Sequence, residues 1–177
     1  MLFRSRRSFE YLDAKMFISL YKSLVRPILE YGNGIWSPIF KGQSIRLENV
    51  QRRATKLISE LYYKSYQERL KYLHLPSLKY RRKRGDLIQI YKIVHELDNL
   101  SPFMFLSFAQ NSITRGDKYK LFVTRCKTNI RQHTLIRRSV YDWNNLKYET
   151  KDADTINGFK NLVDKELKND MMYNFDE

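Results

Sequence analysis

Apolar residues recur with a helical period through the first half of the chain, and this spacing constrains the fold more than any other feature. Between Phe17 and Leu29 the apolar positions fall three or four residues apart, which is the pattern of an amphipathic helix. We expect this helix over about residues 14–31, with Asp13 as its N-cap. Pro27 is expected to stop or kink it, because proline lacks a backbone donor and clashes with the preceding turn.

The same spacing predicts further helices downstream. Apolar positions over 47–61 indicate a second helix whose apolar face packs on the first and whose opposite face is basic. Ser65 and Glu68 have the spacing of a capping box, which starts a short helix. Ser77 then caps a third long helix, about 78–97. We expect this helix to bury Leu87, Ile90, Tyr91, Val94 and Leu97.

The second half of the chain is less regular. Helices are predicted over about 134–146 and 156–168. The stretch LFVTRC, residues 121–126, is rich in β-branched and aromatic residues and is typical of a short strand. Trp36 and Trp143 are interpreted as core anchors, because large aromatic side chains usually pack in the interior.

These patterns predict a mainly α protein with two regions. Residues 1–97 form a helical bundle, and residues 98–177 form a smaller C-terminal region, of α or α+β type, with a basic middle block and a terminal helix. A chain of 177 residues with 42% hydrophobic content can bury one core, or one core and a smaller satellite.

The chain is strongly basic, with a net charge of +14 and a pI of about 9.8. Such a balance favours a polyanion as partner. The charge is uneven: residues 1–97 carry +12, residues 113–141, here called the middle block, carry +7, and residues 142–177 carry −4. We therefore expect a nucleic-acid-binding surface to come from the first half and the middle block.

Cysteine and histidine usage excludes two classes of protein. The single Cys126 rules out an internal disulfide, and three scattered histidines lack the spacing of a zinc site.

The first residues lack the apolar segment of a signal peptide, and no stretch is long enough to cross a bilayer. We expect an intracellular protein, in the cytoplasm or nucleus, that is not secreted and does not bind membranes.

The first group of candidate binding residues lies on the second and third long helices. The run KYRRKRG places five basic residues within six positions, and 3.6 residues per turn direct them around most of the helix. The alternative is a solvated face with some salt bridges. The candidates for phosphate contacts are Arg52, Arg53, Lys56, Arg81, Arg82 and Arg84.

The second group lies in the middle block, where basic residues alternate with aromatic or β-branched ones and the series continues to Arg137 and Arg138. This interleaving indicates a groove that follows the backbone of a single strand, with rings on which bases stack. The alternative is a half-buried strand whose outer face is merely basic. The candidates are Arg115, Lys118, Tyr119, Lys120, Arg125 and Arg131, with Tyr119 as the expected stacking ring.

The sequence shows no catalytic pattern. Two-metal phosphoryl transfer needs carboxylates that converge on shared ions, whereas the acidic residues here are isolated or lie on a predicted surface helix. Cys126 and His133 are the only nucleophile and base near one another in sequence, and we interpret them as a buried thiol and an exposed imidazole. We predict no catalytic residue, metal site, cofactor or small-molecule substrate for this chain.

Long segments of the chain resemble a known family. The region after the polymerase palm in reverse transcriptases of non-LTR (LINE-type, jockey/CR1-like) retrotransposons is similar to LYKSLVRPILEYGNGIWSP, LENVQRRATKLI and YQERLKYLHLPSLKYRRKRGDLIQIYKIVHEL. The resemblance continues through TRGDKYKLFVTRCKTNIRQHTLIRRSVYDWNNL to NGFKNLVDKEL, so it extends over nearly the whole chain.

The resemblance implies a role in holding template and primer. Residues 13–97 would correspond to a helical thumb and residues 98–177 to the C-terminal region that helps to bind template RNA. The implied partners are RNA, an RNA–DNA hybrid, and the palm and fingers of the parent polymerase. The palm aspartates, which would use Mg²⁺, would lie upstream of Met1, so this chain is expected to be an inactive fragment.

Two alternatives remain open at the level of sequence. The chain could be a repurposed basic helical protein that binds an acidic protein partner through its amphipathic helices. It could also be a truncated retrotransposon copy with no selected function.

Overall fold

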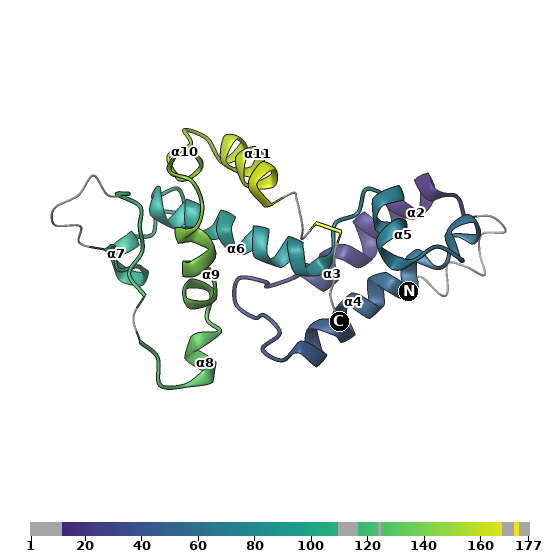
Figure 1. Ribbon diagram of the computed structural model, residues 1–177, viewed down its shortest axis with the longest axis horizontal. Coiled ribbons are helices and arrows are strands. Elements are labelled where there is room, and N and C mark those ends of the chain that lie inside the picture. Colours follow the sequence, from purple (N-terminus) through teal and green to yellow (C-terminus); the bar gives the residue numbers. More distant parts are fainter. Residues whose placement is uncertain (1–11, 110–116, 124, 168–171, 174–177) are drawn as a thin grey trace. The chain divides into compact units, whose positions relative to one another are not determined.

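The computed structural model describes residues 12–109, 117–123, 125–167 and 172–173, and these residues are mainly helical (Figure 1). The expectation of a mainly α fold is confirmed. The described residues form no strand. Where a strand was expected in residues 121–126, Leu121 makes a single antiparallel bridge with Phe108.

The chain divides into two compact units. The first contains the described residues of Met1–Gly32, Pro38–Arg82 and Asp170–Glu177, and the second those of Asn33–Ser37 and Lys83–Asn169. The main division falls between residues 82 and 83, inside a long helix, rather than at residue 97, because the second half of that helix packs with residues from the C-terminal region.

The first helix of the first unit is built from three consecutive segments. These are α2 (Ala14–Leu20), the π-helix η1 (Tyr21–Val25) and α3 (Arg26–Glu30). Asp13 caps the first turn, as predicted, because its Oδ1 accepts a hydrogen bond of 2.6 Å from the backbone N–H of Met16.

Pro27 does not end this helix. The N–H of Arg26, just before the proline, donates to the carbonyl of Tyr21, five residues back. This wider turn accommodates a residue that cannot donate, because the π-helix spaces its hydrogen bonds one residue further apart. The helix continues to Glu30, and the chain leaves it through Gly32, whose φ of 65° is left-handed.

The second helix, α4 (Lys41–Thr55), buries polar side chains as well as apolar ones. It begins and ends about six residues before the expected range of 47–61. Its buried positions include Glu48, Gln51 and Thr55, whereas Val50 is 38% exposed. The prediction that its apolar side packs on the first helix is confirmed by Ala54, which lies with Ile58 and Leu61 in one core with Phe17 and Tyr21. The buried polar side chains were not predicted, and each of them has a hydrogen-bond partner on a neighbouring element.

Glu48 connects α4 to two other helices. Its carboxylate accepts from the backbone N–H of Leu78, at 3.0 and 3.2 Å, and from the hydroxyl of Tyr66 at 2.6 Å. The Leu78 N–H is one of the donors that a helix leaves without a partner in its first turn. A carboxylate at this end is also stabilised by the helix dipole.

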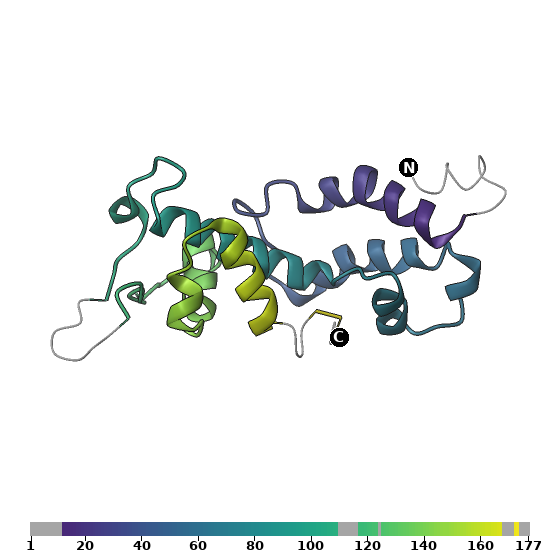
Figure 2. The ribbon, with the colours of Figure 1, turned by 90° about the horizontal axis from the view of Figure 1, so that it is seen from above.

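Gln51 makes the corresponding connection to the first helix. Its Oε1 accepts from the Tyr21 hydroxyl at 2.6 Å, and its Nε2 donates to the carbonyl of Pro76 at 3.1 Å. Figure 2 shows the first helix (purple) running alongside α4 (blue). The two helices are therefore held together by a buried hydrogen bond as well as by apolar packing.

The short helix α5 (Tyr66–Tyr72) begins as predicted. Ser65 and Glu68 form a reciprocal capping box, with hydrogen bonds of 3.3 and 2.8 Å. A single 3-10 turn, η2 (Ser59–Leu61), precedes α5. The apolar core of the first unit consists of Phe17, Tyr21, Ala54, Ile58, Leu61, Leu70, Leu73 and Leu75.

The long helix α6 (Leu78–Val94) starts where it was predicted and ends three residues early. Ser77 caps it, with Oγ accepting from the N–H of Tyr80 at 3.2 Å. At the other end Glu96 has a left-handed φ of 54°, and the N–H of Leu97 donates to a carbonyl five residues back. Leu97 is consequently 50% exposed, which corrects the prediction that it is buried.

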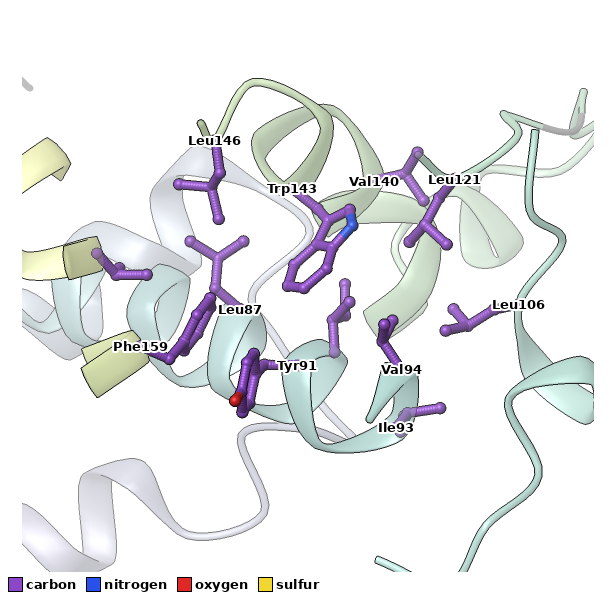
Figure 3. Packing of buried hydrophobic residues seen from close by; sticks show 12 residues of the cluster. Leu87, Tyr91, Ile93, Val94, Leu106, Leu121, Val140, Trp143, Leu146 and Phe159 are labelled. Carbon is purple, nitrogen blue, oxygen red and sulfur yellow. The ribbon is translucent and has the colours of Figure 1, made fainter. Parts of the chain in front are cut away.

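The core of the second unit is built around Trp143 (Figure 3). This residue lies on α9 (Leu135–Asn144), is fully buried, and donates from Nε1 to the carbonyl of Tyr119 at 2.8 Å. Tyr91 of α6 stacks on Phe159 of α11 (Ile156–Leu167), with ring centres 4.3 Å apart. Trp143 is a core anchor as predicted, whereas Trp36 is 41% exposed and is not.

Three one-turn helices complete the described elements: α7 (Pro102–Phe105), α8 (Asn129–Gln132) and α10 (Tyr148–Lys151). Each is too short to produce a periodic signal in the sequence. The run PFMFLSF was compatible with a strand or a helix turn, and its first four residues form the helix turn α7. None of the helices in the described ranges combines the length and the apolar character that a membrane crossing requires.

Replacing Glu48 with alanine should destabilise the first unit. The change leaves the N–H of Leu78 and the hydroxyl of Tyr66 buried without their acceptor, which should lower the free energy of unfolding by about 2–4 kcal/mol. Arg46→Ala, on the exposed side of the same helix, should change it by less than about 0.5 kcal/mol. Urea denaturation followed by circular dichroism measures both, and equal effects would contradict this role of Glu48.

The pH dependence of stability should reveal the burial of Glu48. Burial raises the pKa of its carboxyl above the ordinary value of 4.5, although hydrogen bonds from Tyr66 and Leu78 oppose the shift. A raised pKa contributes stability that is present below the unfolded value and is lost as pH rises through the folded value.

Glu48→Gln should remove this contribution, because glutamine keeps an acceptor oxygen and does not titrate. The stability of the wild type relative to Glu48→Gln should therefore fall as pH rises above the ordinary carboxyl pKa of 4.5. Denaturation curves at several pH values measure the difference, and a difference that grows with pH would show that the shift has the opposite sign.

Candidate nucleic-acid interface

The basic run at the start of α6 is largely engaged in contacts within the first unit. Arg81 makes a two-bond ion pair with Glu30, in which Nη2 donates to Oε2 at 2.8 Å. Arg82 is only 7% exposed and donates from Nη2 to the hydroxyl of Ser44 at 2.9 Å. These two predicted phosphate contacts are therefore occupied by other groups of the same unit.

Two further basic residues of the run, Lys83 and Arg84, are paired within the second unit. Arg84 makes a two-bond ion pair with Asp164 of α11, at 2.5 and 2.9 Å. Lys83 pairs with Asp142 of α9 at 2.7 Å. The solvated-face alternative, in which such a run makes salt bridges, describes these side chains.

The candidates at the C-terminal end of α4 have different surroundings. Arg52 is half-buried, with its guanidinium over the ring of Tyr66 at 5.1 Å. Arg53 and Lys56 are exposed, and within the described ranges neither forms an ion pair. Tyr63, a few residues further on, is 95% exposed. This end of the first unit thus presents two available cations and an accessible aromatic ring.

Tyr119, the ring expected to stack on bases, is half-buried within the second unit. His95 and Tyr148 lie beside it, with ring centres 5.1 and 6.1 Å away, and Lys118 lies 4.6 Å from its centre. Its hydroxyl donates to Asp152 at 2.7 Å. Lys118 also pairs with Asp152, at 3.0 Å.

The titration of this group reflects the same contacts. Hydrogen bonds from Tyr119 and Lys118 lower the pKa of Asp152, and hydrogen bonding with Tyr119 and Asp152 raises the pKa of Lys118. Burial raises the pKa of Tyr119. The carboxylate and the ammonium therefore stay charged, and they neutralise each other.

The other candidates of the middle block are more accessible. Lys120, Arg125 and Arg131 are exposed, and no acidic side chain of the described residues pairs with them. Arg115 lies outside the described residues. The candidates of the middle block thus fall into two groups. Lys118 and Tyr119 are bonded to Asp152, whereas Lys120, Arg125 and Arg131 have no acidic partner among the described residues.

Arg125 and two further arginines converge on a hollow of about 640 Å³ in the second unit. Val123, Arg125, Cys126, the end of α8 and one side of α9 form its walls. The lining includes three arginines and no carboxylate: Val123, Arg125, Cys126, Gln132, His133, Arg137, Arg138 and Tyr141. We call it the basic hollow.

Arg138 is the structural member of the three arginines. It makes a two-bond ion pair with Asp86, with both distances 2.7 Å, and donates to the carbonyls of Asn33 at 2.8 Å and His133 at 3.0 Å. Its side chain is only 12% exposed. By contrast Arg137, the preceding residue, has no hydrogen-bond partner for its buried Nη2 within the described ranges.

Cys126 and His133 both line the basic hollow. The interpretation of a buried thiol and an exposed imidazole was wrong, because both residues are half-buried. Within the described residues no three His, Cys, Asp or Glu side chains are placed to hold a metal ion. The Mg²⁺ implied for a parent polymerase therefore has no set of ligands among them.

No protein-family model matches this chain, and neither does any curated protein or any solved structure at a significant level. The resemblance to retrotransposon reverse transcriptases therefore stays a prediction.

The sequence indicated the region of the basic hollow, but only one of its three arginines was a candidate binding residue. Arg125 was a candidate, and Arg137 and Arg138 were noted only as continuing the basic series. Their difference could not be read from the chain, because the acid that fixes Arg138 lies 52 residues away on α6. Tyr141 has no sequence signal beyond its position one turn after Arg137 on the same helix.

Arg137 and Arg138 should differ sharply when each is replaced with alanine. Arg138→Ala removes the two-bond ion pair of the buried Asp86 carboxylate, so the free energy of unfolding should fall by about 3–5 kcal/mol. Arg137→Ala removes no ion pair among the described residues and should cost less than about 1 kcal/mol. Urea denaturation of both variants tests this contrast, which similar losses would contradict.

Proposed function

We propose that this chain is the nucleic-acid-binding C-terminal part of a non-LTR retrotransposon reverse transcriptase, and that it grips template and primer through phosphate contacts. In this proposal residues 13–97 act as a helical, thumb-like bundle and residues 98–177 as the post-thumb region. The partners are RNA, an RNA–DNA hybrid, and the palm and fingers of the parent polymerase. The chain itself performs no chemical step.

The observation that carries the proposal is a set of cations without acidic partners. Six candidate or neighbouring basic side chains form no ion pair in the described part of the chain. We call them the uncompensated cations: Arg53, Lys56, Lys120, Arg125, Arg131 and Arg137. A net charge of +14 makes acids scarce, so basic side chains remain for an external polyanion.

The paired arginines are less suited to this role. Arg81 and Arg84 each already make two hydrogen bonds to a carboxylate. A phosphate would have to displace that carboxylate, and the displaced acid would repel it. An uncompensated cation needs no such exchange and releases a counterion from the nucleic acid when it binds.

Contacts of this kind suit a polymerase accessory region. Phosphate contacts position a nucleic acid without reading its bases, and a polymerase must move along any sequence. Arginine and lysine on helical surfaces supply such contacts. Catalysis would depend on carboxylates and Mg²⁺ of the parent polymerase, and the proposal assigns no step to them here.

The salt dependence of binding tests the proposal. The purified chain should bind a primed RNA–DNA hybrid with an affinity that falls steeply as salt concentration rises. A triple variant, Arg53→Gln with Lys56→Gln and Arg125→Gln, should flatten the log–log slope by about 2–3, since each lost phosphate contact removes about 0.7–0.9. Fluorescence anisotropy over a salt series measures this slope.

A matched variant separates position from total charge. Arg81→Gln with Lys83→Gln and Arg84→Gln also removes three positive charges, all of them paired in the structure. This variant should change the slope by less than about 1. Circular dichroism confirms that both variants are folded. Weak wild-type binding without salt dependence would overturn the proposal, and so would equal flattening by both triples.

One observation favours a second function, the binding of a protein partner. The first helix exposes three apolar side chains at spacings of eight and four residues: Met16, Leu24 and Ile28 are 40%, 43% and 67% exposed. Such a stripe is typical of a helix that packs on a partner. If the wild-type chain shows no salt-dependent binding to the hybrid, the repurposed interaction protein becomes the better reading.

A further inference from the structure

We infer that the basic hollow binds one nucleotide unit of single-stranded nucleic acid, with its phosphate on Arg125 and Arg137 and its unpaired base against Tyr141. This inference rests on the proposed function and deepens it, because it assigns a particular ligand to one of the basic surfaces. It also distinguishes the second unit, which would hold a single strand, from a surface that only follows a duplex backbone.

The positive charges that line the hollow favour the binding of an anion. Three guanidinium groups line it, and the only carboxylate bonded to them within the described ranges, Asp86, belongs to Arg138. Arg137 is half-buried with a nitrogen that no described group accepts from. A buried donor without an acceptor is unfavourable, and a phosphate oxygen would satisfy it.

Arginine is also the side chain best matched to phosphate. Its planar guanidinium donates two parallel hydrogen bonds to two oxygens of one anion. Arg125 comes from the segment that precedes α8, and Arg137 comes from α9, so the two line the hollow from different parts of the chain. Arg138 fixes the wall between them by its bonds to Asp86 and to the carbonyl of His133.

The volume of the hollow indicates more than a lone phosphate. At about 640 Å³ it lies in the usual range for sites of small organic ligands, about 300–1,000 Å³. A free inorganic anion would leave most of this space to water. A phosphate with its sugar and base would use it.

Tyr141 supplies the contact for the base. It lines the hollow, is 65% exposed, and lies one helical turn after Arg137. Bases stack on exposed aromatic rings with little regard to sequence, provided that they are unpaired. Gln132 and His133 line the same hollow and offer polar groups to a base edge.

Cys126 allows occupancy of the hollow to be measured. It is the single cysteine of the chain and lines the hollow, so a thiol reagent labels one site there. A ten-residue uridine RNA and uridine monophosphate should each slow the alkylation of Cys126 by iodoacetamide. Uridine and inorganic phosphate, at the same concentration as the monophosphate, should slow it much less.

Variants test the assigned roles. Arg125→Ala and Arg137→Ala should each weaken protection by the RNA about tenfold or more, because each removes a charge-assisted contact. Tyr141→Leu should abolish the preference for uridine monophosphate over inorganic phosphate. Lys165→Ala, an equal loss of charge on α11 outside the lining, should leave protection unchanged. Protection is expressed as the ratio of labelling rates with and without ligand within each variant.

The outcomes separate this inference from the proposed function. Equal protection by all anions, or none by the RNA, would overturn the nucleotide site. Binding of the labelled RNA, followed by anisotropy, must fall in the same variants, and an unchanged affinity would also overturn it. If the hybrid still binds with a steep salt dependence, the proposed function stands although the nucleotide site fails. If the RNA does not protect Cys126 and the hybrid shows no salt-dependent binding, both the nucleotide site and the proposed function are overturned.

Discussion

The buried carboxylate of Glu48 fixes the point at which α6 begins, and much of the described structure depends on that helix. Glu48 accepts from the first N–H of α6 and from Tyr66 of α5, while Gln51 on the same face bonds to Tyr21 of the first helix. Beyond its first turns, α6 supplies Leu87 and other apolar residues to the core around Trp143. A polar face inside the first unit therefore holds the first turn of α6 within that unit.

Acids that pair with arginines also decide which cations remain available. Asp86, Glu30 and Asp164 each bind an arginine through two hydrogen bonds, and these arginines serve the fold. The cations left without such partners lie elsewhere, at the end of α4 and around the basic hollow. The densest basic run in the sequence thus contributes less to the proposed nucleic-acid surface than isolated residues such as Arg53 and Arg125.

The sequence was sufficient where the signal is local. The cap at Asp13, the capping box at Ser65 and the burial of Trp143 depend on a few neighbouring residues or on a strong apolar period. It was insufficient where a distant partner decides the outcome. Periodicity counts Glu48 as polar and therefore exposed, because the N–H that it binds lies 30 residues away. The basic hollow was missed as a unit for the same reason.

The central claim is that cations without acidic partners, rather than the densest basic run, contact nucleic acid. Ultraviolet cross-linking of the chain to a uridine-containing RNA, followed by mass spectrometry of the peptides, tests it directly. The account predicts cross-links in the peptides that contain Tyr63, seven residues after Lys56, and Tyr141, in the basic hollow. Cross-links confined to the peptide around residues 79–84, with none at these two tyrosines, would contradict it.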